Sequence, residues 1–156
     1  MKKLILILST VLFFSMTACA KSGKPETNDT GDGMNITIEI TNGKGEKHSL
    51  NASLSQNKSA QAFYELLQKG PLTVKMTDYG NFEKVGSLGT SLPRTDTQIT
   101  TEAGDLILYQ GNQITIYYDV NRWNFTRLGK IKGISQEKLK SLLGKGDVSA
   151  VFSISE

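Results

Sequence analysis

Residues 104–131 have the sequence GDLILYQGNQITIYYDVNRWNFTRLGKI, and this segment decides the fold. It carries the densest run of β-branched and aromatic residues after the N-terminal leader, a composition that favours half-buried pleated strands. We predict three strands in it, over residues 105–109, 114–119 and 123–128. The connection between the first two contains Gly111 and is short enough for a hairpin. The segment therefore predicts an antiparallel meander.

The second of these strands shows the alternation most clearly. Ile114, Ile116 and Tyr118 share one face, while Thr115 and Tyr117 share the other. Such alternation is expected when one face of a strand packs in the core and the other faces water.

Length, charge and composition limit the classes of protein. The chain has 156 residues, enough for one domain with one core. Lys2 and Lys3 lie in the leader, so the formal charge of +3 falls to +1 without them. A near-neutral domain lacks the basic surface that binds nucleic acid, and we predict no such partner. Cys19 and His48 are the only residues of their types, so we predict no intrachain disulfide and no metal site. We also predict no cofactor, and we expect a monomer.

The N-terminus has the pattern of a secretory signal. Residues 1–18 combine a basic start with an apolar run that is too short for an ordinary transmembrane helix. Residues 16–19, Met-Thr-Ala-Cys, resemble the bacterial lipobox, in which the cysteine is lipidated and becomes the mature N-terminus. This resemblance implies an exported protein held at a membrane of the cell envelope through Cys19. A plain signal peptide with an incidental cysteine is the alternative.

The segment that follows Cys19 predicts a tether. Residues 19–33 are rich in Gly, Ser, Thr, Asn and Asp and contain no large apolar side chain beyond the cysteine. Such a segment cannot bury enough apolar surface to offset the entropy of ordering. We predict a lipoprotein signal peptide over residues 1–18, a flexible tether over 19–33 and a folded domain over 34–156.

Outside the central meander, the pattern predicts more strands and two helices. The additional strands cover residues 34–40, 47–54, 72–76 and 147–155. The helices cover residues 55–70, with Asn57 or Ser59 as the cap, and residues 135–143, with Gly144 at the end. A sheet of about eight strands hides its edges by closing on itself. We therefore predict a mainly β fold, a closed barrel of about eight strands with two capping helices.

Residues 77–93 interrupt this regularity. They contain Gly80, Gly86, Gly89 and Pro93 among scattered large apolar residues, which predicts an irregular excursion that forms one wall of any binding site. The spacing of Gly86 and Gly89 is also found in phosphate-binding loops. No Lys-Ser/Thr pair or helix follows, so we do not predict nucleotide binding.

The order of elements resembles the cyclophilin fold. Residues 104–119 look like the cyclophilin segment in which a strand turns through a glycine into a strand that lines the substrate groove. Residues 128–131, Leu-Gly-Lys-Ile, are similar to the Phe-Gly-Lys-Val that follows there. Bacterial cyclophilin-like proteins share YQGNQI, the tryptophan after it, TRLGKI and FEKVGSLGTSLP. The resemblance covers residues 34–155 and implies a cyclophilin-like β-barrel.

The resemblance implies a groove more clearly than an activity. True cyclophilins are prolyl isomerases with a catalytic arginine on the strand after the first helix. Here Lys75 and Lys84 are the only cations near that strand, and a lysine cannot present the planar fork of a guanidinium. The position of the family's histidine, four residues before Gly129, is Phe125. We predict that these residues line the groove: Tyr79, Phe82, Tyr109, Gln110, Asn112, Gln113, Tyr117, Trp123 and Arg127.

The sequence leaves open two functions, one of a binding module and one of an enzyme. The first is a tethered domain that binds a peptide or small ligand in its groove without changing it, with no catalytic residue. The alternative is an extracytoplasmic peptidyl-prolyl isomerase, in which Arg127 or Lys84 replaces the missing arginine and lowers a rotation barrier of roughly 20 kcal/mol. A structural envelope component is a third class. Hydrolase chemistry finds no support, because His48 has no glycine-flanked serine to activate.

Overall fold

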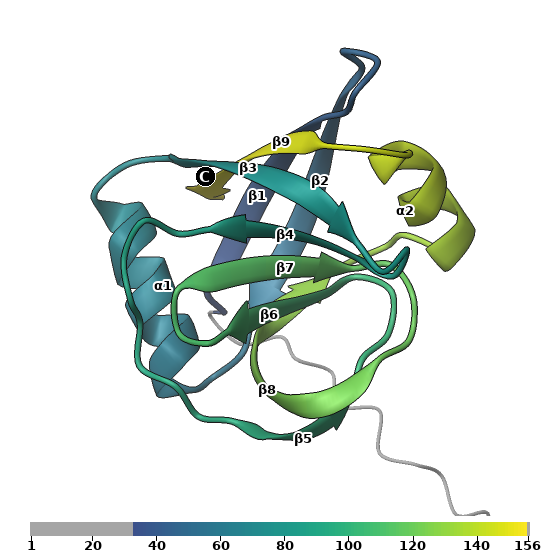
Figure 1. Cartoon of the computed structure of the whole chain (residues 1–156). Helices are drawn as coiled ribbons and strands as arrows, with labels where there is room; N and C mark the ends of the chain where they lie inside the picture. Colours follow the sequence, from purple (N-terminus) through teal and green to yellow (C-terminus); the bar gives the residue numbers. More distant parts are fainter. Residues whose placement is uncertain (1–32, 156) are drawn as a thin grey trace, which may run out of the picture.

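The computed structural model describes residues 33–155 and places them in a closed β-barrel flanked by helices (Figure 1). The predicted signal peptide, the Cys19 lipidation site and the tether up to residue 32 lie outside these described residues. Within residues 33–155, no helix is both long and apolar enough to cross a membrane.

The described chain contains nine strands and two helices. The strands are β1 (Asn35–Thr41), β2 (Lys47–Leu54), β3 (Leu72–Tyr79), β4 (Glu83–Ser87), β5 (Thr97–Thr100), β6 (Asp105–Tyr109), β7 (Gln113–Tyr117), β8 (Arg122–Ile131) and β9 (Val148–Ile154). The helices are α1 (Lys58–Gln68) and α2 (Gln136–Leu143).

Eight of the strands close into an antiparallel barrel, as the sequence predicts. Their order is β2-β1-β9-β3-β4-β7-β6-β8, and β8 pairs back onto β2 through Leu54 opposite Gly129. The two strands approach closely there, because a Cβ atom on Gly129 would lie 2.3 Å from the carbonyl oxygen of Ser53. The ninth strand, β5, pairs only with β8 and lies at the edge of the barrel (Figure 1).

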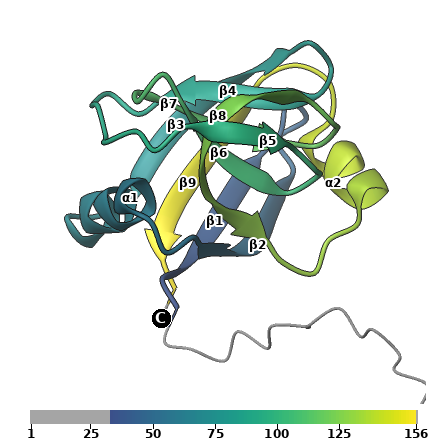
Figure 2. The same ribbon diagram turned by 90° about the horizontal axis from the view of Figure 1, so that it is seen from below.

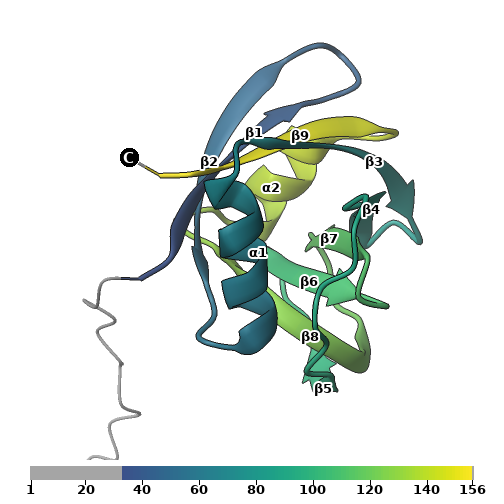
Figure 3. The ribbon, with the colours of Figure 1, turned by 90° about the vertical axis from the view of Figure 1, so that its left-hand side faces the viewer.

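The two helices flank the barrel on opposite sides (Figure 2). Figure 3 shows α1 in front of the barrel and α2 behind it. Phe63 of α1 meets Phe152 of β9 edge-on, with ring centroids 5.8 Å apart, so α1 packs on the core. Asn57 is its N-cap, as predicted, and its side chain accepts a hydrogen bond from the amide of Ala60. Gly144 ends α2 with a φ of 61°, also as predicted.

The prediction of an irregular segment over residues 77–93 is wrong up to Ser87 and confirmed for residues 88–93, which form neither helix nor strand. Strand β3 continues to Tyr79, and β4 follows after a tight turn and pairs with both β3 and β7. The inward face of β4 carries Lys84 and Gly86 in place of large apolar residues. A Cβ atom on Gly86 would lie 2.4 Å from the carbonyl oxygen of Lys75, so a side chain does not fit. The usual apolar alternation of a strand is therefore hidden in the sequence.

The prediction that one face of β7 is wet is also wrong. Thr115 and Tyr117 are buried, like the residues on the core face. Tyr117 packs with Ile107 and Phe125 in a second, smaller apolar cluster on the outside of the barrel. Phe125 lies on β8, which is longer than predicted and runs from Arg122 to Ile131 through the expected turn after residue 128.

Candidate functional site

The second apolar cluster is the base of an open groove on the outer face of the barrel. The groove has a volume of about 720 Å³ and is walled by neighbouring strands that lie side by side in Figure 1. Its lining residues are Tyr79, Gly80, Phe82, Glu83, Val85, Tyr109, Gln113, Tyr117, Asn121, Trp123 and Phe125. Strand alternation explains this set, because Gln113, Thr115 and Tyr117 of β7 point away from the core.

Five aromatic rings follow one another along the groove. Phe82 stacks on Tyr117 with centroids 6.0 Å apart, and Tyr117 meets Phe125 at 5.6 Å. Tyr79 extends this row beyond Phe82 at 5.8 Å, and Tyr109 extends it beyond Phe125 at 6.4 Å. The rings therefore offer a ligand a continuous apolar surface.

Two aromatic residues of the groove remain exposed to solvent. Trp123 has 63% of its surface exposed and Tyr79 has 62%. Tyr117 and Phe125 are buried at the base of the groove, so Trp123 and Tyr79 form its exposed rim. A rim of large exposed rings above a packed base is typical of surfaces that bind a partner or ligand.

A smaller polar cleft adjoins the groove. Its volume is about 430 Å³, and it shares Tyr109 and Trp123 with the groove. Its other lining residues are Arg94, Asp96, Thr97, Gln98, Gln110 and Asn124. Arg94 forms an ion pair with Asp96, so its charge is partly neutralised within the cleft.

The structure brings six of the nine predicted groove residues together. They are Tyr79, Phe82, Tyr109, Gln113, Tyr117 and Trp123. Gln110 lines the adjoining polar cleft. Asn112 is exposed and lines neither, while its carbonyl oxygen accepts a hydrogen bond from the amide of Leu88.

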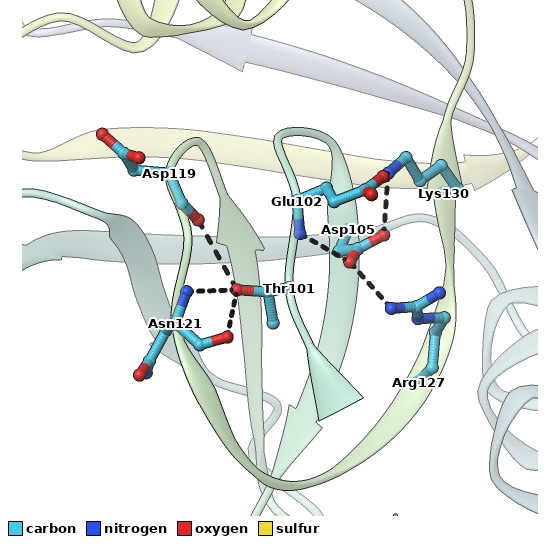
Figure 4. Close-up of polar contacts among 7 residues, drawn as sticks. All are labelled: Thr101, Glu102, Asp105, Asp119, Asn121, Arg127 and Lys130. Carbon is cyan, nitrogen blue, oxygen red and sulfur yellow. Dashed lines mark hydrogen bonds and ion pairs between the residues drawn. The ribbon is translucent and has the colours of Figure 1, made fainter. Parts of the chain in front are cut away.

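Arg127 does not line the groove either. Its Nη2 lies 2.9 Å from Oδ2 of Asp105, a fully buried carboxylate (Figure 4). Lys130 approaches the other oxygen of Asp105 at 3.1 Å, and the amide of Glu102 donates to Oδ2 at 2.9 Å. The guanidinium therefore serves a structural ion-pair network beyond the groove.

The loop before β8 holds one polar group of the groove in place. The amide of Asn121 donates to Oγ1 of Thr101 at 2.8 Å (Figure 4). The Thr101 amide donates to the Asn121 carbonyl, also at 2.8 Å. This double link fixes the backbone of Asn121, whose side-chain Nδ2 donates to the hydroxyl of Tyr117 at 3.4 Å.

Lys84, the other cation considered for catalysis, points away from the groove. Its side chain is fully buried, and Nζ donates to the carbonyl oxygens of Gly144 at 3.0 Å and Gly146 at 2.7 Å. Nζ also pairs with Asp78 at 2.6 Å. Burial of Asp78 opposes its ionisation, but hydrogen bonds from Lys84 and Tyr118 outweigh this effect and lower its pKa.

Glu83 is the groove residue that sequence reasoning missed. It is only 8% exposed, and within the described chain its Oε2 is buried without a hydrogen-bond partner. Burial raises the pKa of Glu83, and an interaction with the Tyr117 hydroxyl lowers it in part. The sequence carries no signal for this position, because a Glu-Lys pair in a glycine-rich segment normally indicates a solvated loop.

The charge of the groove follows from these positions. Among the described residues that line it, Glu83 is the only one with an ionisable acid or base of the Asp, Glu, Lys, Arg or His types. Within residues 33–155, no group of acidic, cysteine and histidine side chains is placed to hold a metal ion.

The closed eight-stranded barrel, its two helices and the groove on its outer face define a cyclophilin-like domain. The chain belongs to the cyclophilin-like family, whose sequence model matches residues 44–154. The fold is also similar to the solution structure of a hypothetical protein from Archaeoglobus fulgidus, with a TM-score of 0.55 and 11% identity over 79% of this chain and 97% of that one. A search of curated proteins found no match.

Proposed function

We propose that this cyclophilin-like domain is a binding module, which holds a peptide or small ligand in the outer groove without changing it. The observation that carries the proposal is the groove itself, about 720 Å³ in volume and walled by aromatic rings. Ligand sites in proteins commonly have volumes of roughly 300–1,000 Å³ and combine apolar walls with a few polar groups. Here Gln113, Asn121 and Glu83 are those polar groups.

The positions of the cations favour binding over catalysis. The resemblance to cyclophilins implies that isomerisation depends on an arginine in the groove. The groove lining in residues 33–155 includes neither Lys nor Arg. Lys84 and Arg127, the two replacements that the sequence suggests, are held by Asp78 and Asp105 instead. No observation favours the isomerase alternative.

We also propose that Cys19 carries the lipid that holds the domain at the cell envelope. The support is the lipobox-like Met-Thr-Ala-Cys directly after the apolar run of the leader. Stable attachment through acyl chains requires about two of them. Labelling of the expressed chain with a radioactive fatty acid tests this, because Cys19→Ala should abolish both the label and recovery in the membrane fraction.

The binding proposal is tested by titrating the full chain, purified in detergent, with a library of proline-containing and other short peptides. Trp123 is the only tryptophan, so its fluorescence reports on the groove directly. We expect saturable changes for a subset of peptides. A flat response across the library would count against binding. Exchange spectroscopy on the same peptides measures isomerisation, and a rate above the uncatalysed one would support the alternative.

A further inference from the structure

We propose that the groove selects ligands carrying a slender cationic group, a primary ammonium or a guanidinium, which pairs with the carboxylate of Glu83. The inference rests on the proposed binding function and specifies its ligand. It reverses the polarity expected from cyclophilins, whose groove offers a cationic hydrogen-bond donor to the ligand.

The first observation is the unbalanced charge of Glu83. A buried carboxylate is costly unless it is hydrogen-bonded and paired with a cation. Glu83 is 8% exposed, and its Oε2 has no hydrogen-bond partner in the described chain. Its cross-strand neighbour is Tyr117, whose hydroxyl interacts with the carboxyl group. A ligand cation would supply both the missing donor and the missing charge.

The second observation is that the neighbouring lysine cannot serve this carboxylate. Lys84 follows Glu83 in β4, so its side chain leaves the opposite face of the strand. Its ammonium is held by Asp78 and by the carbonyls of Gly144 and Gly146. The cross-strand partners of Glu83 are Tyr79 on β3 and Tyr117 on β7. Neither phenol supplies a positive charge.

The third observation is the aromatic surface next to the acid. Phe82 and Tyr117 stack with centroids 6.0 Å apart, and Tyr79 meets Phe82 edge-on. Ring faces attract cations, and the aliphatic stem of a lysine or arginine packs well on them. Because only 8% of Glu83 is exposed, a primary ammonium or planar guanidinium approaches its carboxyl group more readily than a bulky trimethylammonium.

The elevated pKa of Glu83 agrees with this geometry. Burial without a cation raises it, and the Tyr117 hydroxyl compensates only in part. A bound cation would stabilise the carboxylate and offset the burial. Within residues 33–155, the buried carboxyl group of Glu83 thus lacks a cation, which a cationic ligand would supply.

The test titrates the full chain in detergent with four blocked alanine-rich pentapeptides that differ only at the central residue. This residue is Lys, Arg, Nε-acetyl-lysine or norleucine, and a fifth titration uses 1,5-diaminopentane. We expect the Lys and Arg peptides to bind at least about tenfold more tightly than the two neutral peptides. The reason is that hydrogen bonds between charged groups contribute more to binding than hydrogen bonds between neutral groups. Tighter binding of the Lys peptide than of the free diamine would assign the cation to a peptide side chain, and the reverse order would assign it to a free amine.

Two variants isolate the carboxylate. Glu83→Gln should remove the preference for the cationic peptides. Glu39→Gln makes the same charge change at an exposed position of β1, across the barrel from β7, and should keep it. If Glu83→Gln does not fold, amide chemical shifts of the unaltered chain replace it. Shift differences between the Lys and norleucine complexes should then concentrate at Glu83 and Tyr117.

The outcomes separate the inference from the proposed function. Equal affinity for all four peptides, with a response of Trp123, would overturn the cation selectivity and leave a binding groove in place. A preference retained by Glu83→Gln, or shift differences outside the groove, would likewise overturn it. Absence of any response to all five compounds would contradict the binding function as well.

Discussion

Lys84 and Asp78 form an ion pair of 2.6 Å across the β3–β4 hairpin, with the lysine fully buried. The same ammonium reaches the carbonyls of Gly144 and Gly146, which follow α2. One side chain thus joins the hairpin that forms a wall of the groove to the turn that leads into β9.

This relationship predicts a large loss of stability in Lys84→Met. The variant keeps the aliphatic volume but removes the Lys84 donor from two carbonyl oxygens and from Asp78, which retains its bond from Tyr118. This loss should cost about 3 kcal/mol of unfolding free energy. Urea denaturation followed by circular dichroism measures it. Lys75→Met, on the exposed face of β3, is the matched control and should change stability by less than about 0.5 kcal/mol. Equal stabilities of the two variants would contradict the structural role of Lys84.

Strands β2 and β8 approach so closely at Gly129 that we expect any side chain at this position to destabilise the barrel. A Cβ atom there would meet the Ser53 carbonyl oxygen at 2.3 Å, and this oxygen belongs to the backbone of β2. We expect Gly129→Ala to lower the unfolding free energy by about 1–3 kcal/mol through overpacking. Gly43→Ala is the control, because its Cβ would have only ordinary contacts, at 3.6 Å or more. Similar thermal midpoints for both variants would show that β2 and β8 are less tightly apposed.

The exposed rim of the groove predicts that a substitution there weakens ligand binding without lowering the stability of the fold. Trp123→Ala should weaken ligand binding about tenfold, because aromatic anchors carry much of the energy at such sites. The fold should be unaffected, since most of the side chain already faces solvent. Calorimetric titration is the readout, because the variant lacks the fluorescent residue. Val120→Ala, at another exposed apolar position, should bind normally, and an unchanged affinity in Trp123→Ala would exclude this ring from the site.

Glu83 predicts a pH dependence of stability with a definite sign. Its folded pKa lies above the ordinary value of 4.5, so the folded state binds this proton more tightly than the unfolded chain. The resulting stabilisation is present below about pH 4.5 and is lost as the pH rises through the folded pKa. Asp78 acts oppositely, because its pKa is lowered and its contribution is lost as the pH falls.

The difference in unfolding free energy between wild type and Glu83→Gln isolates the contribution of Glu83. Urea unfolding from about pH 4 to pH 8 should show that the variant gains stability relative to wild type as the pH rises, since glutamine does not ionise. Glu39→Gln, at an exposed position, is the control for removal of one acidic charge. Parallel curves for Glu83→Gln would mean that burial does not shift this carboxyl group.

Regular alternation and local turn chemistry made most of the barrel predictable. Residues 47–54 and 105–109 form strands with the predicted bounds, and Asn57 and Gly144 delimit the helices as expected. These features depend on neighbours in the chain, which a sequence displays directly. Strand β4 escaped prediction because a lysine and a glycine occupy its inward positions.

The sequence by itself determined the fold class, the family and the aromatic character of the groove, because side-chain periodicity and the motifs of residues 104–131 are local properties. Only the tertiary structure decided which charges face that groove. Adjacent residues of a strand point to opposite sides, and pairing of β4 with β7 turns Glu83 outward and Lys84 inward. Asp105, distant from Arg127 in sequence, holds the guanidinium away from the groove. Long-range pairing sets these positions, and no short segment encodes it.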